Sequence, residues 1–186
     1  MLIIAGAILL AILVISFFTK RYEKKKIRRY EKALNHMPLA DSMGSLKLIR
    51  EYGYYTSRFP LDTFASVYRY RAANTLLNLN NTTEAINVLH QIQKDYPRSS
   101  QAAYALFLEG FIQENYVRDF GVADSLYNHF LVKYQEHVLY NDVENALYFL
   151  GQAIEQMLKD YEYQRSQDSI IYLDVNSPDS IIYHLD

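Results

Sequence analysis

Cysteine and tryptophan are both absent from the 186 residues of this chain. Without cysteine, the chain can hold no disulfide, no Cys-ligated zinc or iron–sulfur centre, no thiol nucleophile and no lipid-modified N-terminal cysteine. The chain also lacks a large excess of either charge: its formal net charge is -2, which argues against a protein that mainly binds nucleic acid. Because 50% of the residues are hydrophobic, a mostly disordered chain is excluded as well.

An unbroken apolar run covers residues 2–18, and Ser16 is its only polar residue. As a helix it would be about 25 Å long, at the short end of a membrane span. A cleavable signal peptide fits less well, because no positive residue precedes the run and no small-x-small site follows it. We therefore expect an uncleaved transmembrane anchor over residues 1–19, with membrane contact through residues 2–18.

Basic residues follow the apolar run directly, within a segment over residues 20–41 that we interpret as a juxtamembrane stalk. Seven of them are expected at the membrane interface: Lys20, Arg21, Lys24, Lys25, Lys26, Arg28 and Arg29. The positive-inside rule then favours a single-pass protein of the inner, cytoplasmic membrane whose C-terminal side is cytoplasmic, with a periplasmic location as the alternative. A nucleic-acid-binding arm over residues 20–32 is a less favoured interpretation of the same charges.

Beyond residue 40 the chain repeats. Similar helix ends occur at Pro60, Pro97 and Gln135, spaced by 37 and then 38 positions. Apolar residues before the second and third ends share the spacing i, i+3, i+4, i+7, i+11, which marks one buried stripe on a helix. The small residues Ala73, Gly110 and Gly151 fall at equivalent places, where a second helix can approach closely. We expect helices over about residues 42–58, 61–79, 83–95, 100–116, 120–134 and 140–161, and no strand before residue 168.

The units over residues 42–161 resemble tetratricopeptide repeats. Ala73, Leu76 and Pro97 match the family's pattern in one unit, and Leu106 and Gly110 match it in the next. The Tyr-Pro-x-Ser helix end and the Ala-Leu-Phe-Leu-x-Gly run are similar to bacterial cell-envelope repeat proteins, of the barrel-assembly repeat lipoprotein or Tol–Pal division-coordinator type. The resemblance implies an all-α, helical-hairpin repeat solenoid, here joined to an N-terminal transmembrane helix.

The same resemblance implies a concave groove lined by the first helix of each unit. Its candidate residues are Tyr70, Asn74, Asn78, Tyr104, Phe107, Phe111 and Asn115. Aromatic rings beside amide donors suit an apolar or extended peptide. Alternatively, the rings simply pack against the next helix, as aromatic residues at helical spacing usually do.

No pattern in the sequence supports catalysis. The histidines lack metal-binding spacing, and neither a Gly-rich phosphate loop nor a Gly-x-Ser-x-Gly motif occurs. We therefore expect no enzymatic activity, no metal or cofactor, no small-molecule substrate and no nucleic-acid partner.

An acidic tail over residues 162–186 contains the motif Asp-Ser-Ile-Ile-Tyr twice, starting at Asp168 and at Asp179. Its residue types favour strands around a turn at Pro178. The two copies could form a β-hairpin, add as strands to a partner's sheet, or form no ordered structure.

These observations together indicate a membrane-tethered scaffold for protein–protein interaction. The resemblance places it in a bacterial cell-envelope assembly, secretion or chaperone complex. The alternative is an accessory or regulatory subunit that presents a peptide substrate to a partner enzyme.

Overall fold

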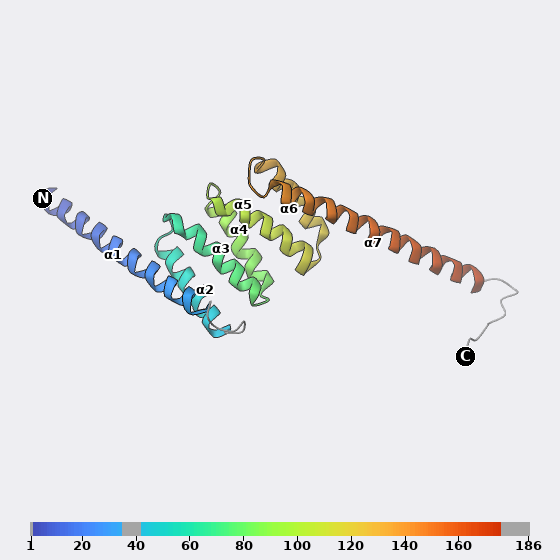
Figure 1. The fold of residues 1–186 in the computed structure, drawn as a ribbon, viewed down its shortest axis with the longest axis horizontal. Coiled ribbons are helices and arrows are strands. Elements are labelled where there is room, and N and C mark those ends of the chain that lie inside the picture. Colours follow the sequence, from blue (N-terminus) through green and yellow to red (C-terminus); the bar gives the residue numbers. More distant parts are fainter. Residues whose placement is uncertain (1, 35–41, 176–186) are drawn as a thin grey trace. The chain divides into compact units, whose positions relative to one another are not determined.

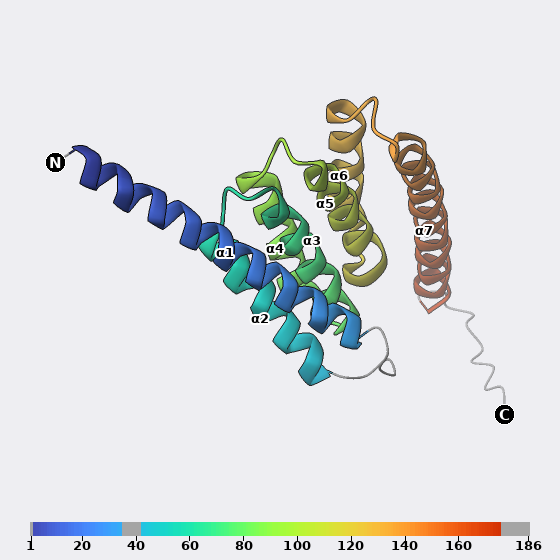
Figure 2. The same cartoon turned by 60° about the vertical axis from the view of Figure 1, so that its left-hand side comes forward.

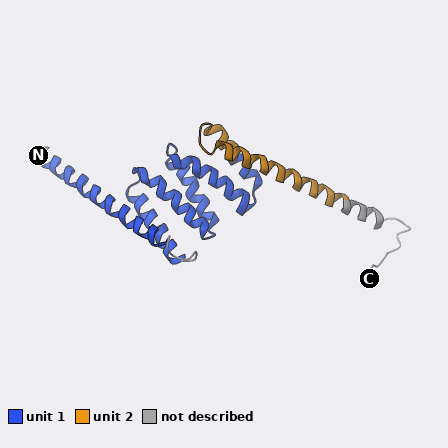
Figure 3. Cartoon of the chain, in the orientation of Figure 1, with its two compact units in different colours: residues 1–126 blue, residues 127–186 orange. Residues whose placement is uncertain are grey.

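The computed structural model of the chain describes residues 2–34 and 42–175, with side chains for residues 4–34 and 42–166, and all of its regular elements are helical. The predicted all-α class is therefore confirmed. The elements are α1 (Leu2–Leu34), α2 (Ser42–Arg58), α3 (Thr63–Asn78), α4 (Thr82–Asp95), α5 (Ser100–Ile112), the π-helical turn η1 (Gln113–Val117), α6 (Phe120–Lys133) and α7 (Tyr140–Val175). The chain divides into two compact units, residues 1–126 and 127–186, and the boundary falls within the sequence of α6 (Figure 3).

The turns between helices follow from their residue types. Asp62 precedes α3, and its side chain accepts a hydrogen bond from the backbone N–H of Phe64. Asn81 caps α4 in the same way, and Asn80 adopts a φ of 58°, in the left-handed region that Asn tolerates better than most residues. The helices α2 to α5 consequently start and end close to the predicted positions.

In the first unit, each helix from α1 to α5 packs against the next, and α3 also packs against α5 (Figures 1 and 2). One buried cluster joins α3, α4 and α5 and contains the small residue Ala73. A second cluster joins α1, α2 and α3; its buried members are Ile27, Leu48, Tyr52, Tyr55, Tyr68 and Ala72. The repeated apolar stripes therefore form the seams between neighbouring helices.

A separate stalk was predicted over residues 20–41, but the part of it over residues 20–34 is not separate from the first unit. It continues α1 without a break and packs against α2, and the Ile27 side chain is 0% exposed. Residues 35–41 of the expected stalk lie outside the described residues. Residues 20–34 pack against the unit because Lys24, Ile27 and Glu31 follow helical spacing and share the face of α1 that is turned towards α2 and α3.

In the second unit, α7 is 36 residues long and continues beyond the predicted end at residue 161. The first copy of the tail motif, residues 168–174, therefore lies in a helix and not in a strand of a hairpin; the second copy lies outside the described residues. Extending an existing helix needs no new nucleus, whereas an isolated hairpin is marginal. Gly151 is exposed, and apart from its chain neighbours and the backbone of its own helix nothing described lies within 4 Å of where its Cβ would be, so no second helix approaches it among the described residues.

Candidate functional site

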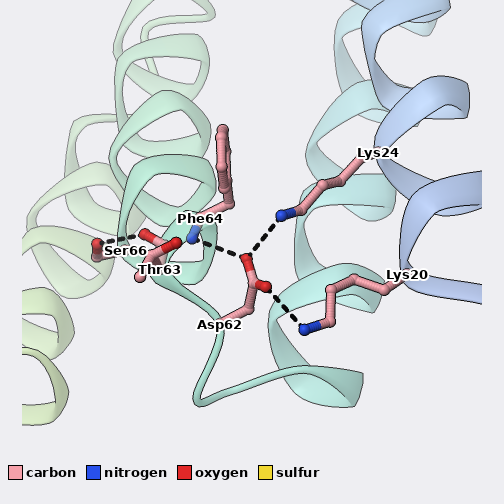
Figure 4. Close-up of polar contacts among 6 residues, drawn as sticks. All are labelled: Lys20, Lys24, Asp62, Thr63, Phe64 and Ser66. Atoms are coloured by element: carbon pink, nitrogen blue, oxygen red, sulfur yellow. Dashed lines mark hydrogen bonds and ion pairs between the residues drawn. The ribbon is translucent and has the colours of Figure 1, made fainter. Parts of the chain in front are cut away.

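A carboxylate bound by two ammonium groups joins α1 to the start of α3. Lys20 Nζ lies 3.0 Å from Asp62 Oδ2, and Lys24 Nζ lies 3.0 Å from Asp62 Oδ1 (Figure 4). The carboxylate also accepts the Phe64 N–H over 2.9 Å, so that it caps α3 and binds two ammonium groups at once. Asp62 thereby attaches the helix of the apolar run to the repeat helices.

The surroundings of Asp62 keep it charged. Its side chain is only 9% exposed, and burial by itself would raise its pKa. Hydrogen bonds from the Phe64 N–H and from Lys24 and Lys20 outweigh burial and lower the pKa to about 2. The Lys24 ammonium also lies 3.9 Å from the ring centroid of Phe64, a cation–π contact that helps to hold it in place.

Further polar contacts hold the rest of the α1 inner face. Lys26 Nζ lies 2.7 Å from Glu51 Oε2 on α2. Glu31 accepts hydrogen bonds from the Tyr52 hydroxyl over 2.8 Å and from Arg71 Nη1 over 2.6 Å. Burial of the Tyr52 ring, followed by the negative charge of Glu31, raises the pKa of this phenol, which therefore stays protonated as the donor.

The opposite face of α1 is a stripe of exposed cations at i, i+4, i+7, i+8 and i+11, here called the outer stripe: Arg21, Lys25, Arg28, Arg29 and Lys32. None of them makes an ion pair with another residue that the structure describes. The seven residues expected at the membrane interface are thus divided between two faces. Three bind carboxylates of α2 or of the α3 cap, and the other four are exposed.

An open groove of about 630 Å³ runs along α1 between these two faces, and we call it the α1 groove. Its lining consists of Phe17, Lys20, Arg21, Lys24, Lys25, Arg28 and Asp62. Sequence reasoning missed Asp62, because no local spacing connects it to the basic segment. Its place after Pro60, where a helix must start again, indicated a cap and nothing more.

Two of the residues predicted to line a peptide groove lie close to each other. The rings of Tyr70 on α3 and Tyr104 on α5 lie 6.2 Å apart, so the structure brings these two predicted residues together. Tyr70 is half-buried and packs against the cluster formed by α3, α4 and α5. Burial raises the pKa of its hydroxyl. The Tyr70 side chain thus packs between helices and is also partly exposed at the surface.

The other candidates lie further along α3 and α5, except for Asn115, which lies in the turn η1 that follows α5. The Asn74 side-chain amide donates to the Tyr70 carbonyl, and that of Asn115 donates to the Phe111 carbonyl, each over 3.0 Å. Each amide keeps a second N–H for another acceptor. Phe111 is 37% exposed, Phe107 is half-buried, and Asn78 is exposed. Aromatic surface and amide donors are both present, but these side chains also make contacts within the first unit.

A second open groove, of about 570 Å³, lies where α3 and α5 begin. Arg69 crosses it, with Nη1 2.6 Å from Asp95 Oδ2 and its guanidinium 5.2 Å from the ring centroid of Tyr96. Hydroxyl groups of Ser66 and Ser100 line the same groove. No motif in the sequence singled out these residues.

In the part of the chain that the structure describes, no three His, Asp or Glu side chains are grouped so that they could hold a metal ion. Comparison with protein-family models and with curated proteins found no match to this chain.

Proposed function

We propose that this chain is a membrane-tethered scaffold for protein–protein interaction. The observation that carries the proposal is the double character of α1. Its first half is apolar on all sides, and its second half is the first packed helix of the repeat unit. The anchor and the interaction module thus share one continuous helix.

The apolar half of α1 has the properties of a membrane span. The large apolar side chains between residues 4 and 18 are 45% to 66% exposed, and the helix is long and apolar enough to cross a bilayer. In water, so much contiguous apolar surface would drive association, whereas lipid covers it without cost. Cations directly after Phe18 support a cytoplasmic position for the repeat unit, with the periplasm as the alternative.

The repeat unit supplies the surface for a partner. We infer that it works as a tetratricopeptide-like module and binds an extended peptide along α3 and α5, in a bacterial envelope assembly, secretion or chaperone complex. The paired rings of Tyr70 and Tyr104, the exposed edge of Phe111 and the remaining amide N–H groups of Asn74 and Asn115 suit such a ligand.

Alkaline carbonate extraction of membranes tests the tether. The unaltered chain should stay in the pellet, and a Leu9→Arg/Ile12→Arg variant should move to the supernatant, because each arginine costs about 3 kcal/mol within a span. A Leu61→Arg/Val132→Arg variant makes the same change at exposed residues outside the run and should stay in the pellet. Extraction of the unaltered chain would contradict the proposal.

Site-specific photocrosslinking in intact cells tests the interaction surface. A crosslinker in place of Phe111 should capture one discrete partner, and a crosslinker in place of the exposed Asn87 on α4 should not. Adding Tyr70→Ala to the first variant should reduce capture. Equal capture from both positions would show that binding does not use the α3–α5 surface.

A further inference from the structure

The α1 groove has an excess of positive charge with a defined arrangement. Five of its seven lining residues are cations, and the single carboxylate, Asp62, is already bound by Lys20 and Lys24. Arg21, Lys25 and Arg28 complete the lining and have no ion-pair partner among the described residues. The groove can therefore accept negative charge without displacing a contact that holds the fold.

The two paired lysines remain available as donors. An ammonium group has three N–H donors, and one contact with Asp62 leaves two of them on Lys20 and two on Lys24. Their side chains are 36% and 21% exposed, so the ammonium groups can be reached from the groove. Asp62 and the ring of Phe64 hold Lys24 in place, which reduces the entropy lost when it binds a second anion.

The groove lies at the level where the apolar run ends. Phe17 forms its apolar edge, and Lys20 and Lys25 follow about 5 Å and about 12 Å further along the helix axis. Helix tilt and the length of the side chains bring these cations to the headgroup layer when the apolar run spans the bilayer. Cationic groups of the kind that bind phosphate thus lie directly after the apolar run, whose surface suits acyl chains.

We propose that the α1 groove binds the headgroup of an anionic phospholipid. Arg21 and Arg28 offer planar donor pairs for the phosphate oxygens, and Lys20, Lys24 and Lys25 add charge around it. The acyl chains lie along Phe17 and the apolar run. Phe17 and that run favour a lipid over a free anion as the occupant. This inference rests on the membrane tether proposed above.

Native mass spectrometry of the full chain, released from detergent micelles, tests this assignment. With equal amounts of phosphatidylglycerol and phosphatidylcholine added, the chain should retain the anionic lipid at least about tenfold more. An Arg21→Gln/Lys25→Gln/Arg28→Gln variant should lose the preference. These three residues are exposed and make no described ion pair, so the fold should be retained, which circular dichroism checks.

A matched variant removes the same amount of charge elsewhere on the first unit. Arg50, Arg58 and Arg98 are exposed and lie outside the α1 groove, so an Arg50→Gln/Arg58→Gln/Arg98→Gln variant should keep the preference. Equal loss in both variants would show that net charge alone attracts the lipid, and would overturn the inference. Equal retention of both lipids by the unaltered chain would overturn it as well.

Inorganic phosphate distinguishes a lipid site from a general anion site. Millimolar phosphate should leave the bound phosphatidylglycerol in place, and its displacement would show that the groove does not select a lipid. Carbonate extraction separates the two proposals. A chain that stays in the membrane pellet but shows no lipid preference contradicts this inference alone, whereas a chain that is extracted contradicts the tether.

Discussion

Lys24 on α1 and Asp62 at the cap of α3 are joined by an ion pair of 3.0 Å, and Lys20 binds the second oxygen of the same carboxylate. A residue within two turns of the apolar run is therefore bound directly to the repeat helices. The contact is largely enclosed, since the Asp62 side chain is 9% exposed. Removing one partner of such a pair costs stability, because the other charge is left enclosed without a counter-charge.

Asp62→Asn should lower the stability of the full chain in detergent micelles by about 2 kcal/mol, measured by chemical or thermal unfolding. Asparagine remains a good helix cap, so the loss reports the ion pairs with Lys20 and Lys24 and not the cap. Asp119→Asn is the matched control. Asp119 accepts the Val122 N–H at the start of α6 without a described ion pair, so its substitution should change little.

The lowered pKa of Asp62 predicts how stability depends on acidity. Its folded-state pKa of about 2 lies below the ordinary value of about 3.9, so the folded chain binds fewer protons in that interval. The contribution of Asp62 is complete above about pH 5 and is lost progressively as the pH falls through about 4 towards 2. Unfolding curves between pH 2 and 6 should show this loss, and Asp62→Asn should remove it. An unchanged pH profile in that variant would contradict the assignment.

Glu109 on α5 should behave in the opposite way. Its side chain is buried, and burial raises its pKa, although nearby His90 and a 2.6 Å hydrogen bond from Gln93 Nε2 oppose the shift. The stability due to the protonated form is therefore lost as the pH rises through the raised pKa. Glu109→Gln should stabilise the chain at pH 7 by on the order of 1 kcal/mol, as melting temperatures would show. A lower melting temperature at pH 7 would argue that the charged form is the favoured one.

Ile27→Ala should destabilise the first unit by roughly 2–5 kcal/mol, because it leaves a cavity between α1, α2 and α3. Lys25→Ala alters the exposed face of the same helix and should leave the unfolding midpoint unchanged. If residues 20–34 were a free stalk, both substitutions would be neutral. The pair of variants therefore distinguishes a packed helix from a linker.

Helix positions in the repeat region were predictable because local signals define them. The apolar stripe ending at Tyr96 gives the buried face of α4, and Asn80 and Asn81 give the turn before it. The end of α7 was missed, because the Ile-Ile-Tyr motif favours a strand by residue type, whereas the preceding helix extends through it. At this motif the extension of an existing helix outweighs the strand preference of the individual residues.

The candidate site was less predictable, since it depends on distant contacts. The basic residues after the apolar run were recognisable as a group, but their charge alone cannot tell which of them face Asp62 or Glu51. Tyr70 and Tyr104 were selected through family resemblance, and the structure places their rings side by side.

The apolar half of α1 and the half that packs in the first unit belong to one continuous helix. Contacts of Lys24, Ile27 and Glu31 hold the second half against α2 and α3. One extra residue inserted after Phe18 would rotate the apolar half by about 100° about the helix axis while leaving every contact of the repeat helices in place. For a chain tethered as proposed, the orientation of the repeat helices relative to the membrane therefore depends on the helical phase between the two halves of α1.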